Sequence, residues 1–262
     1  MRRPIIIQGI KYDANSSFMT GPAKAPEIIK EAFYSDSINA YSELGINVTE
    51  SDQITFLDPI SPKDFYQNIY DSIHGHISAG NAVISLGGDH SITYPIIAAH
   101  AEFYKNITIL QIDAHSDLYE DFENNPFSHA SPFARIMEKK LASRLIQIGI
   151  RCLTPHQIDQ AQKFDVEIIE MKDFTSDNNL DIQGPLYISL DLDGLDPAFA
   201  PGVSHHEPGG LTTRDVLNLL HSLDAQIIGA DIVEYNPVRD HIGMTAALAA
   251  KLLKEIAGKM IS

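Results

Sequence analysis

Histidine and aspartate are concentrated in three short segments of the sequence, each of which follows an apolar run. The segments are GGDHS at 87–91, DAHSD at 113–117 and SLDLDGLDP at 189–197. DAHSD repeats acid and histidine at a spacing of two, which in an extended chain puts all three side chains on one face. Asp191 and Asp193 share a face for the same reason. Neither segment contains Lys or Arg, and burying unpaired carboxylates costs on the order of several kcal/mol. Something must therefore neutralise these carboxylates.

Taken together, the three segments offer two imidazoles and four carboxylates. The candidate metal ligands are His90, Asp113, His115, Asp117, Asp191 and Asp193. Four negative charges balance two divalent cations, and mixed nitrogen and oxygen ligation suits Mn²⁺, with Fe, Ni, Co and Zn as alternatives. Two such ions would share bridging carboxylates and lower the pKa of a water between them. Each segment also has a plain structural interpretation. In GGDHS, Asp89 would be a helix N-cap; DAHSD would be a salt-bridged strand end; and in SLDLDGLDP, Asp196 would form a turn.

The surrounding sequence alternates apolar runs with amphipathic stretches. We expect strands at 4–10, 82–86, 107–112, 145–150, 166–169, 186–192 and 227–232. Helical spacing relates Phe65, Ile69, Ile73 and Ile77, and a second helix follows Thr212 as its N-cap. Leu248, Leu252 and Ile256 mark a C-terminal helix. This alternation predicts one α/β domain over residues 1–262, a three-layer α/β/α fold with a mostly parallel central sheet. Ligands of such sheets bind beyond the carboxyl ends of the strands, where the three segments lie.

The charge and cysteine content of the chain limit the binding partners and the cellular compartment that we expect. Nineteen basic and 35 acidic residues give a formal net charge of −16, which argues against nucleic acid and anionic membranes and favours cationic ligands. The single cysteine, Cys152, excludes an intrachain disulfide, fits a reducing compartment and is expected to be an inert buried thiol. The apolar run at 5–7 is too short for a signal peptide or a membrane span. We therefore expect a cytoplasmic protein.

The three segments, in this order, resemble the signatures of the ureohydrolase family, which includes arginase and agmatinase. The resemblance extends to GPAKAPEIIKEA (21–32), IGIR (148–151), GADIVEYNP (229–237) and TAALAAKLL (245–253), and so covers essentially the whole chain. It implies an arginase-like fold and a binuclear manganese site. By position, one ion would be held by His90, Asp113, Asp117 and Asp191. The other would be held by Asp113, His115, Asp191 and Asp193, with Asp113 and Asp191 bridging.

The resemblance also implies roles in catalysis. Glu234 aligns with the glutamate that pairs with the substrate guanidinium, and Asp117 with the ligand that protonates the leaving amine. His129 falls where the family keeps a proton-shuttling histidine, although Ala130 follows it where arginases usually have glycine. The implied reaction is hydrolysis of a guanidino group to urea and an amine. Family members commonly form trimers or hexamers, so we expect a homo-oligomer.

The loop after DAHSD bears on the substrate. Arginases carry polar residues there that grip the α-carboxylate of arginine, whereas this chain has Tyr119 and, at 124–128, NNPFS. Three acids, Glu120, Asp121 and Glu123, suit a second cationic end, so we expect agmatine, with putrescine as the product. Guanidinobutyrate, guanidinopropionate, guanidine, arginine and formiminoglutamate remain alternatives. Arg135 or Arg151 would be needed for an acidic substrate. An inactive metal-binding paralogue and a deacetylase-like amidohydrolase are further alternatives.

One more stretch, APGVSHHEPGG at 200–210, first suggests a metal site because two histidines adjoin a glutamate. The six ligands above already complete the metal set, so this stretch is better interpreted as a specificity loop over the cleft. His205 stands where the family has a threonine that positions the guanidinium. We therefore expect Ser204 and His205, with Glu234, to contact the substrate.

Overall fold

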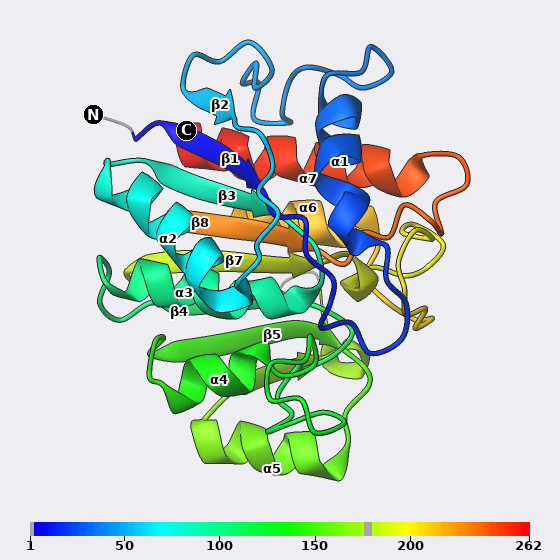
Figure 1. Cartoon of the computed structure of the whole chain (residues 1–262). Helices are drawn as coiled ribbons and strands as arrows, with labels where there is room; N and C mark the ends of the chain where they lie inside the picture. Colours follow the sequence, from blue (N-terminus) through cyan, green and yellow to red (C-terminus); the bar gives the residue numbers. More distant parts are fainter. Residues whose placement is uncertain (1–2, 176–179) are drawn as a thin grey trace.

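The computed structural model describes residues 3–175 and 180–262 and contains one eight-stranded sheet, in which every pair of neighbouring strands is parallel (Figure 1). The strand order is β2-β1-β3-β8-β7-β4-β5-β6. The strands are β1 (Ile5–Gly9), β2 (Ile54–Phe56), β3 (Ala82–Leu86), β4 (Thr108–Ile112), β5 (Arg144–Ile150), β6 (Glu167–Glu170), β7 (Pro185–Asp191) and β8 (Gln226–Val233). Those in the middle are apolar and buried on both faces, as a covered parallel sheet requires.

Helices cover both faces of the sheet. One face packs against α2 (Phe65–Ser78), α3 (Thr93–Ala101), α4 (Pro132–Glu138) and α5 (Pro155–Phe164). The other packs against α1 (Ala25–Phe33), α6 (Thr213–Ser222) and α7 (Met244–Ile261) (Figure 1). The two apolar cores alternate along each strand: Val83 faces the first layer and Ile84 the second. The predicted three-layer α/β/α fold is confirmed.

Local signals explain most of the boundaries. Thr212 caps α6 through a reciprocal capping box, with Thr212 Oγ1 accepting from the Asp215 N–H and Asp215 Oδ2 accepting from the Thr212 N–H. Sequence patterning missed β2, an edge strand whose three residues, Ile54–Phe56, are too few to show a periodic pattern. Within the described residues, no helix is long and apolar enough to cross a membrane.

Candidate metal centre

The GGDHS segment forms a tight connection at the carboxyl end of β3. Gly88 passes so close to Tyr12 that a Cβ built on it would lie 1.9 Å from the Tyr12 carbonyl oxygen. Asp89 then caps the short 3₁₀ turn His90–Ile92, accepting a hydrogen bond from the Ser91 N–H at 3.1 Å. The N-cap interpretation of Asp89 is therefore confirmed. It is compatible with a metal site, because the cap turns the fully buried His90 towards the neighbouring strand ends.

The other two segments meet because β4 and β7 are neighbours, with Ile112 opposite Leu190. A 3₁₀ turn at Leu192–Gly194 follows β7 and brings Gly194 against the start of DAHSD. A Cβ on Gly194 would lie 2.8 Å from the Asp113 nitrogen, so only glycine permits this approach. The expectation of an extended DAHSD is wrong: β4 ends at Ile112, and Asp117 has a φ of 50°. The side chains converge through this turn instead of through strand alternation.

His90 stands at the centre of one group of acids. Its Nδ1 lies 3.1 Å from Asp113 Oδ2, 3.0 Å from Asp117 Oδ2 and 3.2 Å from Asp191 Oδ2. None of these contacts is a hydrogen bond, and this buried nitrogen has no hydrogen-bond partner among the described residues. A lone pair that faces three carboxylates at these distances is the donor arrangement that a divalent cation requires.

Two further residues fix the orientation of that imidazole. His90 Nε2 lies 2.9 Å from Ser189 Oγ, and Ser189 in turn donates to Asp231 Oδ1 at 2.7 Å. Because the serine hydroxyl gives its own hydrogen to Asp231, it accepts from His90, and the ring hydrogen is therefore on Nε2. Asp231 is completed by donors from Thr93 and Tyr187, each at 2.9 Å. Such outer contacts set the tautomer of a metal-binding histidine.

The second group of acids surrounds His115. Its Nδ1 lies 3.1 Å from Asp193 Oδ2 and 3.7 Å from Asp113 Oδ1. Asp113 thus faces both imidazoles, one through each carboxylate oxygen, which is the placement expected of a bridging ligand. Donor atoms of His90, Asp113 and Asp117 lie within 4.8 Å of one another, as do those of Asp113, His115 and Asp193. The structure therefore brings together all six candidate ligands, and their donor chemistry fits two divalent ions.

The electrostatics of the group also favour cations. Burial, followed by the charges of Asp193 and Asp113, raises the pKa of Asp191 well above its usual range. Burial and Asp113 raise the pKa of Asp117 to about 6. Carboxylates so placed resist ionisation unless positive charge compensates them. Bound cations would supply that charge and hold all four acids ionised.

Glu234 and His129 form a buried pair beside the acids. His129 Nδ1 lies 2.8 Å from Glu234 Oε1, which also accepts from the His90 N–H at 2.9 Å. Burial lowers the pKa of His129, but the charge and hydrogen bond of Glu234, together with the charges of Asp117 and Asp89, raise that pKa to about 9. Glu234 Oε2 is buried without a hydrogen-bond partner among the described residues. One carboxylate oxygen thus anchors the histidine and the other is available.

Ser17, from the loop after β1, contacts the opposite side of the His129 ring. Its N–H donates to His129 Nε2 at 3.2 Å, and its hydroxyl lies 2.8 Å from the same nitrogen. The neutral ring can accept from the Ser17 N–H, whereas the protonated ring can donate to the Ser17 hydroxyl. Both protonation states of His129 therefore have partners, as a proton shuttle needs.

Backbone strain is concentrated at two of these residues. Asp117 and Glu234 have φ values of 50° and 62°, in the left-handed region that non-glycine residues rarely adopt. Glu234 directly follows β8, and its N–H donates to the Gly88 carbonyl at 3.0 Å. Strained positions that the surrounding structure holds in place are typical of functional sites.

A cavity of about 280 Å³ opens over the group. Its inner wall carries carboxylates and imidazoles, and its outer wall is aromatic and neutral. The lining residues are Ser17, His115, Asp117, Tyr119, Phe122, His129, Ala130, Cys152, Thr154, Gln157, Asp191, Asp193, His205 and Glu234. None of these is Lys or Arg.

The two histidines of the 200–210 loop point in different directions. The His205 ring lies on the cavity wall, with ring centroids 5.5 Å from His129 and 5.7 Å from His115. His206 is directed away, its Nε2 2.8 Å from the Pro201 carbonyl oxygen. Ser204 does not line the cavity; its hydroxyl accepts from Asn236 and donates to the Met19 carbonyl. The predicted substrate contact therefore fits His205, while Ser204 instead anchors the loop.

Arg151 holds the same loop in place. Its guanidinium donates to five carbonyl oxygens, those of Glu207, Gly149, Asp193, Gly194 and Leu195. Arg135 pairs with Glu138 at 2.7 Å. Both arginines that an acidic substrate would need are thus engaged elsewhere.

Comparison with known proteins shows which family the chain belongs to. The model of the Arginase family matches residues 3–258. The chain belongs to the arginase family. It is 43% identical to "Arginase 1, mitochondrial" from Arabidopsis thaliana, over 96% of this chain and 80% of that protein. It is 33% identical to an N(1)-aminopropylagmatine ureohydrolase from Thermus thermophilus, over 93% of this chain and 86% of that protein. The solved arginase from Medicago truncatula superimposes with a TM-score of 0.92 at 41% identity, covering 99% and 87% of the two chains.

The family membership confirms the predicted ureohydrolase resemblance. This arginase-family chain is a binuclear-metal amidinohydrolase. The expectation of a cytoplasmic protein is corrected by the same comparison, because the plant relatives are named as mitochondrial or chloroplastic/mitochondrial arginases. Neither the net charge nor the short apolar run at 5–7 distinguishes the cytoplasm from an organelle, so composition could not have made that distinction.

Sequence reasoning missed several residues of this arginase-family site. Ser189 and Asp231 are polar side chains within apolar strands, a signal that was available in the sequence. Ser17 comes from an irregular loop, and no spacing rule connects it to His129. Cys152, expected to be buried, is half-buried and lines the cavity. It lies two residues after the end of β5, so it emerges at the same sheet edge as the other site residues.

Proposed function

We propose that this protein hydrolyses the guanidino group of a cationic alkylguanidine, agmatine, to urea and putrescine. The observation that carries the proposal is the composition of the cavity: four carboxylates line it, and no Lys or Arg is among the described residues that do. A guanidinium is stabilised by such a wall, whereas a substrate carboxylate finds no opposite charge there.

Glu234 is suited to orient the guanidinium. Its Oε1 is occupied by His129 and the His90 N–H, so the unpartnered Oε2 accepts from the planar substrate through a charge-assisted hydrogen bond. Because both oxygens are then engaged, the substrate is held in one orientation with its carbon above the metal ligands. The lining rings of Tyr119 and Phe122, 5.1 Å apart between centroids, would flank the alkyl chain and the distal ammonium.

The remaining residues divide the metal and proton chemistry. The six ligands would hold two divalent cations, and we propose Mn²⁺ because the donor set is mainly carboxylate oxygen with imidazole. When bound, the two ions supply a water of lowered pKa as the nucleophile. Asp117 would accept the proton that this water loses and pass it to the leaving amine, the role that the family resemblance implies. His129 exchanges protons with solvent past Ser17.

Arginine is a second candidate substrate, favoured by the 43% identity to the Arabidopsis thaliana arginase. The outer cavity wall includes Thr154 and Gln157, neutral polar side chains that can accept or donate hydrogen bonds. Neutral hydrogen bonds can hold the amino acid end of arginine without a cationic partner. The same groups serve an ammonium through their oxygens, so the cavity favours agmatine only through charge.

The test is a direct comparison of substrates. The Mn²⁺-loaded protein is incubated with agmatine, arginine, guanidinobutyrate, guanidine or formiminoglutamate, and urea and formamide are both measured. The proposal predicts urea as the product and the highest kcat/KM with agmatine. A higher kcat/KM with arginine would replace agmatine by arginine. Formamide from formiminoglutamate as the main product would overturn both.

A further inference from the structure

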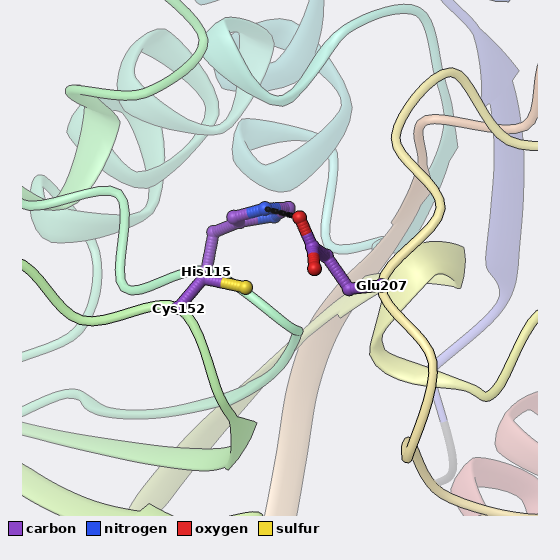
Figure 2. A group of neighbouring side chains, drawn as sticks. All are labelled: His115, Cys152 and Glu207. Atoms are coloured by element: carbon purple, nitrogen blue, oxygen red, sulfur yellow. Dashed lines mark ion pairs between the residues drawn. The ribbon is translucent and has the colours of Figure 1, made fainter.

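A second group of metal-ligating side chains shares one residue with the metal centre, and two of its members, His115 and Cys152, line the cavity. Figure 2 shows its three members, His115, Cys152 and Glu207, which follow β4, follow β5 and lie in the 200–210 loop. One nitrogen, sulfur or oxygen atom from each lies within 4.8 Å of the others. All three are partly accessible, so an ion could reach them from the cavity.

The two nitrogens of the His115 ring face different partners. Nδ1 lies 3.1 Å from Asp193 Oδ2, on the side of the six-ligand centre. Nε2 faces the other way, 4.0 Å from Glu207 Oε1. That separation is too long for a hydrogen bond. His115 Nε2 and the Glu207 carboxylate therefore face each other, with the Cys152 thiol alongside, but do not form a hydrogen bond with each other.

The three donors select a particular class of ion. A thiolate is a soft ligand that binds Zn²⁺ far better than Mn²⁺ or Mg²⁺, and Cys, His and carboxylate are all common zinc ligands. Around tetrahedral zinc, donor atoms lie roughly 3.3–3.8 Å apart, so donor atoms that lie within 4.8 Å of one another must approach by at most about 1.5 Å. Glu207 can make that movement, because its side chain is 43% exposed while Arg151 fixes its main chain.

We propose that His115, Cys152 and Glu207 form an additional site for a thiophilic divalent cation such as Zn²⁺, and that filling it blocks the cavity. On binding, Cys152 releases its thiol proton and His115 releases its Nε2 proton to solvent, so that the thiolate and the imidazolate nitrogen coordinate the ion. An ion held by His115 and Cys152, which both line the cavity, occupies space that the substrate must enter. This site is chemically distinct from the centre formed by the six nitrogen and oxygen donors.

Cobalt provides a probe that does not depend on turnover. The Mn²⁺-loaded protein is titrated with Co²⁺, and near-ultraviolet absorption from thiolate-to-cobalt charge transfer is recorded. Cys152 is the only cysteine in the chain, so this absorption can arise only from Cys152. We expect the band in the wild type, its loss in Cys152→Ser and its displacement by Zn²⁺. No band in the wild type would overturn the proposal.

The Glu207→Gln variant distinguishes a site formed by all three side chains from metal binding by Cys152 alone. The substitution keeps the loop, because Arg151 contacts the main-chain carbonyl of residue 207. We expect the apparent Co²⁺ affinity to fall about 10-fold or more, as for loss of one ligand. An unchanged affinity in Glu207→Gln would show that Cys152 acts without this cluster and would contradict the proposal.

Zinc inhibition tests the functional part. Urea release by the wild type and by Cys152→Ser is measured at increasing Zn²⁺ concentrations. Each rate is expressed relative to the zinc-free rate of the same protein. We expect the half-inhibiting Zn²⁺ concentration to rise about 10-fold or more in Cys152→Ser. Zinc that displaces the cobalt band without slowing urea release would refute the blocking role. The cobalt measurement stands whether or not agmatine is the substrate, so failure of this site and failure of the proposed function are separable.

Discussion

His129 Nδ1 lies 2.8 Å from Glu234 Oε1, and this contact joins the proposed proton carrier to the proposed substrate anchor. The two residues come from the loop before α4 and from the end of β8. The carboxylate stabilises the charged imidazole, and the imidazole in turn orients the carboxylate. Each side chain therefore has a role that depends on the other.

This contact predicts how His129 titrates. In chelated, metal-free protein, nuclear magnetic resonance of the imidazole should give a pKa of about 9, to which Glu234 contributes most of all the acids. In Glu234→Gln the largest opposing charge is gone and burial remains, so the pKa of His129 should fall well below that of the wild type. A His129 pKa that is the same in both proteins would refute the coupling.

The same shift has a consequence for stability. The folded-state pKa of His129 is raised, so its stabilising contribution is present below about 6.5 and is lost as pH rises through about 9. The pKa of Glu234 is lowered, against burial, by His129, so its contribution is lost as pH falls below 4.5. Metal-free wild type should therefore exceed Glu234→Gln in unfolding free energy most clearly between about pH 5 and 6.5. Denaturant titrations at pH 6 and pH 10 measure this difference in unfolding free energy. A difference that is the same at both pH values would contradict the prediction.

Ser189 should control metal affinity without contacting the metal. Ser189→Ala removes the acceptor that keeps the His90 hydrogen on Nε2, and loss of such an outer contact weakens metal binding about 10- to 100-fold. Ser85→Ala is the matched control, because Ser85 is equally buried in the nearby strand β3 but has no hydrogen-bond partner among the described residues. Calorimetric titration with Mn²⁺ measures both. Equal Mn²⁺ affinities in the two variants would show that Ser189 does not control metal binding through His90.

Gly194 should be intolerant of any side chain. A Cβ there would lie 2.8 Å from the Asp113 nitrogen, so Gly194→Ala should separate the two ligand-bearing segments and lower both thermal stability and metal content. We expect a loss of about 1–3 kcal/mol in unfolding free energy. Gly75→Ala, in the middle of α2 with open space around its Cβ position, should be neutral or stabilising. Thermal melts of the two variants that coincide would contradict this interpretation.

His205 and His206 offer a comparison of adjacent histidines. His205→Ala removes a ring from the cavity wall, so KM for the guanidino substrate should rise about 10-fold while the metal content stays the same. His206→Ala changes a ring that points away from the cavity, so KM should remain within about twofold of the wild type. If His206→Ala has the larger effect on KM, the loop does not act as proposed.

The sequence was informative where residue type and strand position coincide. Four carboxylates and two imidazoles without basic neighbours, all after apolar runs, predict a shared sheet edge because parallel strands end together. The detailed convergence was not predictable. Asp117 reaches the group through a left-handed backbone, and Gly194 permits an approach that depends on β4 and β7 being neighbours. Ser17 could not be found at all, because only tertiary packing brings its loop to His129.

The central claim is that the six strand-end ligands hold the metal ions that hydrolyse the guanidino substrate. It is tested most directly by urea release from Asp191→Asn at saturating Mn²⁺, with metal content determined on the same sample. Asp191 lies 3.2 Å from His90 Nδ1, and Asn keeps its shape while removing its charge. The account predicts loss of bound metal and a fall in urea release of about a thousandfold or more. Turnover close to the wild-type rate in this variant would contradict it.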